Sequence, residues 1–259
     1  MTRLVRVELL KLRTMRVTYG LLAAAAAVTA LFSSLEASGA GRSVPSVATA
    51  AGLGDVTTVG GVAMILAAVL GVIVTSGEFR HTSITLTYLA TPDRRRVLGA
   101  KAIATAFVGG CYGLAAGIVA TAVGLAFVAA HGDPVTVGAV TMIGHIAGAG
   151  AGAALLAAFG VGVGSLVRAQ LAGVIGVFVW CMVIESILGG SLSAIRPYLP
   201  YTVATTLGGA RLGAGAFGPG YSISAQQALP FLAGAALLAA TAAAVAAIAA
   251  RTTVRRDVT

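Results

Sequence analysis

The chain has 259 residues, of which 58% are hydrophobic and only 10% are charged, and its formal net charge is +9 at pH 7. This composition excludes a water-soluble globular domain. The positive charge would suit nucleic acid, but the basic residues lie beside apolar segments, where they favour membrane topology and contact with anionic lipid headgroups. We therefore expect a membrane protein that has lipids, and no nucleic acid, among its partners.

The first segment, residues 2–16, is basic and imperfectly amphipathic. At 100° per residue, Arg3, Arg6 and Arg13 fall on one side, and Leu4 and Leu12 fall on the other. This pattern predicts a helix lying along the membrane surface. The alternative is a frayed basic flank that serves only to orient the chain.

Six uncharged apolar segments follow, each of about the roughly 20 residues that a membrane crossing requires. Lipid offers no hydrogen-bond partners to a backbone, so we predict that every one of them is a helix. The predicted spans are Val17–Leu35, Val59–Gly77, Ala102–Ala130, Val135–Val167, Leu171–Leu188 and Leu229–Ala250. The sequence therefore predicts an all-α polytopic membrane protein, a single transmembrane domain over residues 1–259 with six transmembrane helices.

The basic residues orient these spans. Of the 17 Lys and Arg residues, 14 fall in the N-terminal segment, in alternate gaps and in the C-terminal tail. Basic residues in short connections mark the cytoplasmic side, so we expect both termini in the cytoplasm. The abundance of Ala, and of Arg over Lys (15 Arg and 2 Lys), is associated with a GC-rich bacterial genome, so we expect a bacterial plasma membrane. Residues 189–228 then form an extracellular region, whose three prolines and eight glycines predict short half-inserted helices rather than a long one.

The fourth span is glycine-rich and long. It carries the pairs Gly144 with Gly148 and Gly160 with Gly164, whose four-residue spacing lets helix backbones approach closely. Such pairs pack either inside one subunit or at a dimer seam. With 33 residues between Pro134 and Arg168, the segment predicts a tilt, a break at the glycines or a projection beyond the membrane.

Residues 78–101 form the longest cytoplasmic loop predicted by the charge pattern. The loop is rich in threonine, and a short helix is expected over Thr82–Leu89, ended by Pro92. Arg94, Arg95 and Arg96 are expected to anchor the chain where the third span begins.

Motifs for bound chemistry are missing from the sequence. A phosphate-binding loop needs Gly-Lys-Ser/Thr, but Lys11 and Lys101 are followed by Leu and Ala. Neither H-E-x-x-H nor C-x-x-C occurs, so we expect no metal site and no redox site. We predict no catalytic residue and no cofactor on this chain, and no enzyme.

Three polar or aromatic residues stand out within the spans. Glu185 is the only carboxylate well inside a span, and buried charge in a membrane is a functional hypothesis by default. It serves a substrate cavity or a packing network, or else reaches the outer interface. Trp180 either lines a cavity or packs as an ordinary aromatic, and His145 is expected to be a hydrogen-bonded core residue.

Three stretches resemble the permease subunit of a type-2 ATP-binding-cassette (ABC) transporter in its six-span bacterial form. The prefix VELLKLR resembles the family's N-terminal elbow helix, and IRPYLPYTVATTL resembles the segment after span five. The most specific match is EFRHTSITLTYLATPDRRRVLGAK, which resembles the family's segment after span two.

This resemblance implies a permease energised by a cytoplasmic ABC ATPase subunit, which binds the ATP, and paired with a second permease copy or a paralogue. It implies export of a drug, a peptide or a lipid-like substrate, and no motif names which one. The residues expected to couple to the ATPase are Glu78, Arg80, Ile84, Leu86, Tyr88 and Leu89. The residues expected to line a substrate cavity between spans two and five are Met64, Val69, Trp180 and Glu185.

Two other classes of function are compatible with the sequence. One is an ion-coupled secondary transporter or channel, although a single carboxylate within the spans offers it few proton sites. The other is a structural membrane protein that transports nothing. Dependence on a partner ATPase distinguishes both from a permease.

Overall fold

The computed structural model describes residues 1–38, 61–80, 93–132, 134–135, 137–167, 169–209, 212–213, 221–222 and 228–252. The main helices are α1 (Thr2–Thr14), α2 (Arg16–Ala37), α4 (Gly61–Arg80), α6 (Arg94–His131), α7 (Ala139–Val167), α8 (Gln170–Val179), α9 (Glu185–Ser191), α10 (Pro200–Leu207) and α11 (Phe231–Arg251). A π-helix, η1 (Trp180–Ile184), joins α8 to α9, and a 3-10 helix, η2 (Arg196–Tyr198), precedes α10. Two short strands, β1 (Leu212–Gly213) and β2 (Tyr221–Ser222), pair antiparallel.

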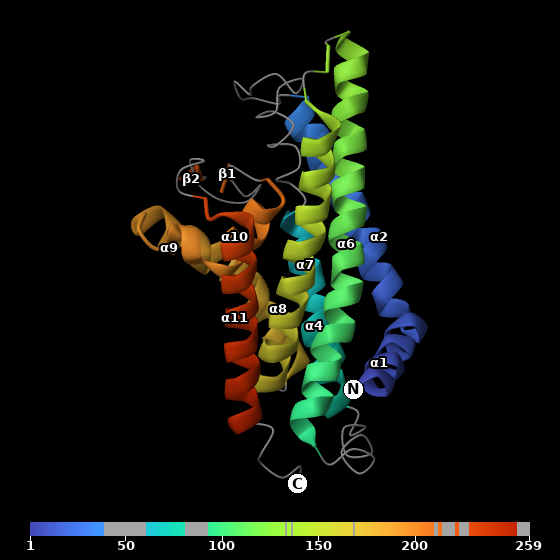
Figure 1. The fold of residues 1–259 in the computed structure, drawn as a ribbon, viewed down its shortest axis with the longest axis vertical. Helices are drawn as coiled ribbons and strands as arrows, with labels where there is room; N and C mark the ends of the chain where they lie inside the picture. The colour runs from blue at the N-terminus through green and yellow to red at the C-terminus, as the bar shows by residue number, and fades with distance from the viewer. Residues whose placement is uncertain are drawn as a thin grey trace.

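Six helices in the described residues are long and apolar enough to cross a membrane: α2, α4, α6, α7, the continuous run from α8 to α9, and α11. Helices α4, α6, α7 and α11 run roughly along the long axis of the molecule, whereas α9 turns sideways away from the bundle (Figure 1). We call one end of this bundle the basic end, because Lys11, Arg95, Lys101 and Arg251 lie there. Both α1 and the last turn of α11 are at the basic end, as six crossings require.

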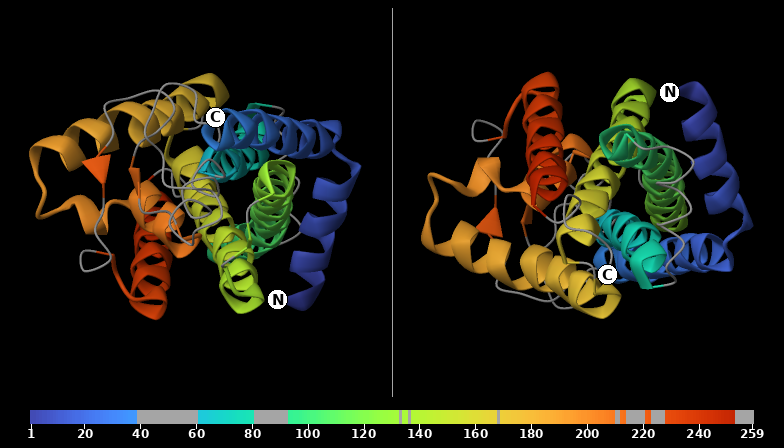
Figure 2. Two further views of the ribbon diagram at one scale, coloured as in Figure 1. Left: turned by 90° about the horizontal axis from the view of Figure 1, so that it is seen from above. Right: turned by 90° about the horizontal axis from the view of Figure 1, so that it is seen from below.

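Helix α7 is the centre of the bundle, and α4, α6, α10 and α11 all pack against it (Figure 2). It is one unbroken helix of 29 residues, so the break considered for the fourth span does not occur. At 1.5 Å per residue it is about 44 Å long, more than the roughly 30 Å of hydrocarbon. It therefore extends beyond the apolar layer unless it is steeply tilted.

The glycines of α7 explain how its neighbours come so close. A Cβ on Gly148 would meet the backbone of Leu207 in α10, and a Cβ on Gly160 would meet the carbonyl oxygen of Ala68 in α4. Gly164 lies against Val72 of α4 in the same way, whereas Gly144 faces open space. Thus the pair Gly160 and Gly164 packs inside one subunit rather than at a dimer seam.

We expect Gly160→Ala to lower the free energy of unfolding by about 1–3 kcal/mol, the usual cost of overpacking a tight contact. Gly144→Ala is the matched control on the same helix. It should be neutral or stabilising by about 0.5–1 kcal/mol, because alanine is the better helix former and meets no atom there. Thermal unfolding in detergent measures both variants, and equal stability of the two would contradict this packing.

Helix α6 begins earlier than its hydropathy predicts. The predicted span starts at Ala102, but the helix starts at Arg94, so Arg94–Arg96 form its first turn rather than a loop. Asp93 caps it: the Arg96 backbone N–H donates to Asp93 Oδ1 at 3.3 Å, and the Arg96 guanidinium pairs with Oδ2 at 2.9 Å. The first turn consists of charged residues, so the hydropathy pattern did not predict that the helix begins there. The complete helix of 38 residues is about 57 Å long.

In the described residues after the fifth span, two short helices precede the β1–β2 pair, and their starts agree with the prolines. Pro197 lies in η2, and Pro200 begins α10, where its missing N–H costs nothing. Helix α10 packs on the middle of α7, at Gly148 and Gly152, and on the first turns of α11, whose other end lies at the basic end. This position brings α10 close to Glu185.

Candidate functional site

Two polar clusters among the described residues are built around buried carboxylates, and the first is at the basic end. It consists of Glu8 and Lys11 from α1, Glu78 from the end of α4 and Lys101 from the second turn of α6. We call these four residues the charge cluster. Glu8 and Lys11 lie three residues apart, so one face of α1 presents both signs of charge.

Each lysine of the charge cluster contacts both carboxylates. Lys11 Nζ is 2.7 Å from Glu8 Oε1 and 3.0 Å from Glu78 Oε1. Lys101 Nζ is 2.9 Å from Glu8 Oε2 and 2.8 Å from Glu78 Oε1. The result is a closed ring of four ion pairs with no net charge, which joins three helices that are far apart in the sequence.

Because the ring of ion pairs is mostly buried, it contributes to the docking of the three helices. The side chains of Lys101 and Glu8 are 3% and 5% exposed, that of Glu78 is 13% exposed, and only Lys11 reaches substantially into solvent, at 40%. Exposed ion pairs contribute little, but removing one member of a buried set leaves an uncompensated charge. Helix α1 is therefore fixed to α4 and α6 by interactions that are costly to break singly.

The cluster shifts the pKa values of both α1 members. Burial alone raises the pKa of the Glu8 carboxyl, but the charges and hydrogen bonds of Lys101 and Lys11 outweigh it, and the net pKa lies below the ordinary 4.5. Burial alone lowers the pKa of the Lys11 ammonium, but its contacts with Glu8 and Glu78 outweigh it and leave the net pKa above the ordinary 10.5. Docking of α1 therefore favours both charged forms.

These shifts predict the pH range over which α1 stays docked. Because the pKa of Glu8 is lowered, its contribution is complete above pH 4.5 and is lost as the pH falls through the lowered value. Because the pKa of Lys11 is raised, its contribution is complete below pH 10.5 and is lost as the pH rises through the raised value. Spin labels at Val7 and Ile103 should report a constant distance between these limits and a longer one in acid. A distance that stays unchanged once the Glu8 carboxyl has been protonated would contradict the linkage.

Of the residues predicted to couple to an ATPase, Glu78 is bonded within its own chain. Its Oε1 accepts hydrogen bonds from Lys11 and Lys101, whereas Oε2 is buried without a hydrogen-bond partner among the described residues. Arg80 is the last residue of α4. The other four, Ile84, Leu86, Tyr88 and Leu89, lie outside the described residues. The sequence analysis did not predict that Glu8 and Lys101 are the partners of Glu78. The signal that could have indicated it is that Glu8 and Lys101 carry opposite charges and each lies beside an apolar span.

The second polar cluster surrounds Glu185, which is fully buried. Its Oε1 accepts hydrogen bonds from Trp180 Nε1 at 2.8 Å and from the backbone N–H of Tyr201 at 2.9 Å. Its Oε2 accepts from the backbone N–H of Thr202 at 3.0 Å and from the Thr202 hydroxyl at 3.2 Å. We call Glu185, Trp180, Tyr201 and Thr202 the Glu185 cluster.

The Glu185 carboxylate caps helix α10 from a different helix. The cap residue of α10 is Leu199, which has no side-chain oxygen to bind the free N–H groups of the first turn. Glu185 binds those of Tyr201 and Thr202 instead, and its negative charge suits the positive end of the helix dipole. Glu185 therefore belongs to a packing network rather than to the outer interface.

The π-helix brings Trp180 and Glu185 together. Residues five apart lie about 140° apart around a regular α-helix, too far for these side chains to meet. In η1 the Glu185 N–H donates to the Trp180 carbonyl, a bond that spans five residues and places both side chains on one face. π-helical turns of this kind occur frequently at functional sites.

The four residues predicted to line a substrate cavity occupy two different places. Trp180 and Glu185 bond to each other beside the start of α10. Met64 and Val69 are 2% and 3% exposed in the core side of α4. A groove of about 510 Å³ lies elsewhere, between α6 and α11, and none of these four residues lines it.

Comparison with known proteins adds no relative: a scan against protein-family models gave no match, and neither did a search of curated proteins. Among the described residues, no group of three or more His, Cys, Asp and Glu side chains could hold a metal ion.

Proposed function

We propose that this chain is the membrane-spanning permease subunit of an ATP-driven exporter of the type-2 ABC class. It would work with a separate cytoplasmic ATPase and a second copy or paralogue, and its substrate would be a drug, a peptide or a lipid-like molecule. In this proposal the basic end faces the cytoplasm of a bacterial cell, in agreement with the position of 14 of the 17 basic residues.

The observation that carries the proposal is the charge cluster. Glu78 and Lys101 flank residues 81–92, the part of the loop proposed to contact the ATPase, and both are bonded to α1. A force applied to that loop would therefore act on α1, α4 and α6 as one unit. An energised partner needs such a unit, because ATP can shift the spans only through contacts that differ between its states.

Packing supports a route from the basic end to the far side of the bundle. Helix α4 packs closely on α7 through Gly160 and Gly164, and α7 packs on α10 through Gly148 and Gly152. Helix α10 in turn is held by Glu185 of the fifth span. These contacts link the proposed ATPase side to the region proposed to release substrate.

The test is partner recruitment by the loop. Tyr88→Asp should leave membrane insertion intact and weaken binding of the co-purifying ATPase about 30-fold, since an apolar anchor lost from an interface hot spot costs about 2 kcal/mol. Tyr198→Asp is the matched control, because Tyr198 is 56% exposed at the opposite end of the bundle. Pull-down of the ATPase and its hydrolysis rate in liposomes measure both variants.

Wild-type recruitment and hydrolysis in both Tyr88→Asp and Leu86→Asp would contradict the coupling role of the loop. Transport by the purified chain alone, driven by an ion gradient, would instead identify a secondary transporter. A chain that neither transports nor stimulates any ATPase would be a structural membrane protein.

A further inference from the structure

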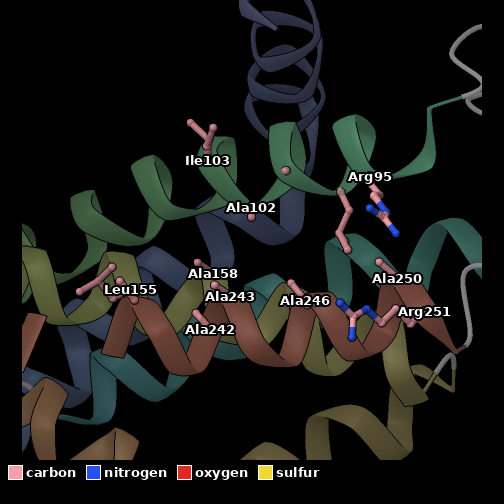
Figure 3. A pocket seen from close by; sticks show the side chains of 14 residues that line it. Arg95, Ala102, Ile103, Leu155, Ala158, Ala242, Ala243, Ala246, Ala250 and Arg251 are labelled. Atoms are coloured by element: carbon pink, nitrogen blue, oxygen red, sulfur yellow. The ribbon is translucent and has the colours of Figure 1, made fainter. Parts of the chain in front are cut away.

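The groove between α6 and α11 has a floor, two walls and a charged end (Figure 3). Leu155 and Ala158 of α7 form its floor. The wall from α11 consists of Ala239, Ala242, Ala243, Ala246, Ala247 and Ala250, and the wall from α6 consists of Leu98, Gly99, Ala102 and Ile103. The two arginines that line it, Arg95 and Arg251, lie together at the basic end.

The apolar part of the groove has the length of one membrane leaflet. The alanines of α11 recur at intervals of three and four residues, so they share one face of the helix. From Ala239 to Ala250 that face is about 17 Å long, close to half of the roughly 30 Å hydrocarbon layer. Alanine side chains are too short to fill the space between two helices, which leaves the groove open beside the 52% exposed Ile103.

The charged end is equipped to bind an anion. Arg95 and Arg251 are exposed, and neither forms an ion pair with a carboxylate among the described residues, whereas the adjacent Arg96 is paired with Asp93. Among the described residues, no carboxylate lines the groove. Guanidinium groups bind phosphate through paired hydrogen bonds, and basic pockets between transmembrane helices suit anionic headgroups.

We propose that this groove binds one anionic phospholipid, with an acyl chain along the alanine face of α11 and the phosphate between Arg95 and Arg251. The charged end favours a lipid over a helix from a second copy, because a lipid phosphate supplies the negative charge that Arg95 and Arg251 lack among the described residues. This inference does not depend on the proposed transport function.

Lipid retention measured by native mass spectrometry tests the site. The chain is reconstituted with equal amounts of phosphatidylglycerol and phosphatidylcholine of identical acyl chains, then released into detergent. The wild type should retain phosphatidylglycerol preferentially, and Arg95→Gln with Arg251→Gln should lower that preference about tenfold or more, as expected for two basic residues near a lipid surface. The control, Arg13→Gln with Arg16→Gln, removes two exposed arginines outside the groove and should keep the preference.

A second variant tests the acyl site independently of charge. Ala246→Trp fills the groove and should reduce phosphatidylglycerol retention while both arginines remain. The proposal is overturned if the Arg95 and Arg251 variant retains the wild-type preference, if the Arg13 and Arg16 control loses as much, or if Ala246→Trp has no effect. A photo-crosslinker at Ala247 that captures a second copy of the chain instead of lipid would also overturn it.

Discussion

Replacing Lys101 by methionine is expected to lower the free energy of unfolding by about 3–5 kcal/mol, the usual cost of removing one partner from a buried ion pair. Lys101 is 3% exposed and contacts both Glu8 and Glu78. In the variant these carboxylates keep only Lys11, so the buried part of the charge cluster carries a net negative charge. Helix α1 should then undock from α4 and α6.

Two matched substitutions separate this effect from a general loss of charge. Arg13→Met removes an exposed arginine from α1, at the same end of the bundle as Lys101, and should change stability by less than about 0.5 kcal/mol. Adding Glu8→Gln to Lys101→Met restores neutrality and should recover part of the loss. Thermal unfolding and the distance between spin labels at Val7 and Ile103 measure stability and docking. If Lys101→Met is as stable as Arg13→Met, the cluster does not hold α1.

Replacing Glu185 by alanine is expected to cost about 3 kcal/mol, because the N–H groups of Tyr201, Thr202 and Trp180 would lose their acceptor in a buried site. Glu185→Gln keeps one acceptor oxygen and should cost less, about 1–2 kcal/mol. The loss of structure should be confined at first to the beginning of α10, because the substitution removes only the cap of that helix and leaves α7 and its neighbours packed.

Ser186→Ala is the control for Glu185→Ala. Ser186 is the next residue in α9, and its hydroxyl donates only to the Met182 carbonyl of the same span, at 2.8 Å. Its removal should cost less than about 1 kcal/mol. Hydrogen exchange over residues 200–207, together with thermal unfolding, distinguishes the variants. Unchanged protection of those residues in Glu185→Ala would show that Glu185 does not cap α10.

The sequence predicts the spans well, because the apolar composition that identifies a span in the sequence also requires a helix in the structure. A run of apolar residues without charge can satisfy its backbone in lipid only as a helix, and Val17–Leu35 accordingly lies inside α2. The short helices η2 and α10 follow from prolines at helix starts. The beginning of α6 was missed because its first turn is charged and is set by the Asp93 cap rather than by hydropathy.

The polar clusters could be predicted only as isolated residues. Glu185 was recognisable as a buried carboxylate. Its contact with Trp180 depends on one π-helical turn, because a regular α-helix would hold the two side chains apart. Glu78 was recognisable as a charge at a span end, but its partners are 67 and 23 residues away. Such pairings depend on how helices pack in space, which local periodicity does not determine.

The charge cluster has a consequence for the chemical labelling of this protein. The chain contains two lysines, and both belong to the cluster. Amine acylation requires an accessible, unprotonated amine, and Lys101 is buried while Lys11 is held as an ammonium by two carboxylates. Modification of a lysine side chain is therefore a native reporter of helix α1 leaving the bundle, readable by mass spectrometry without any engineered cysteine.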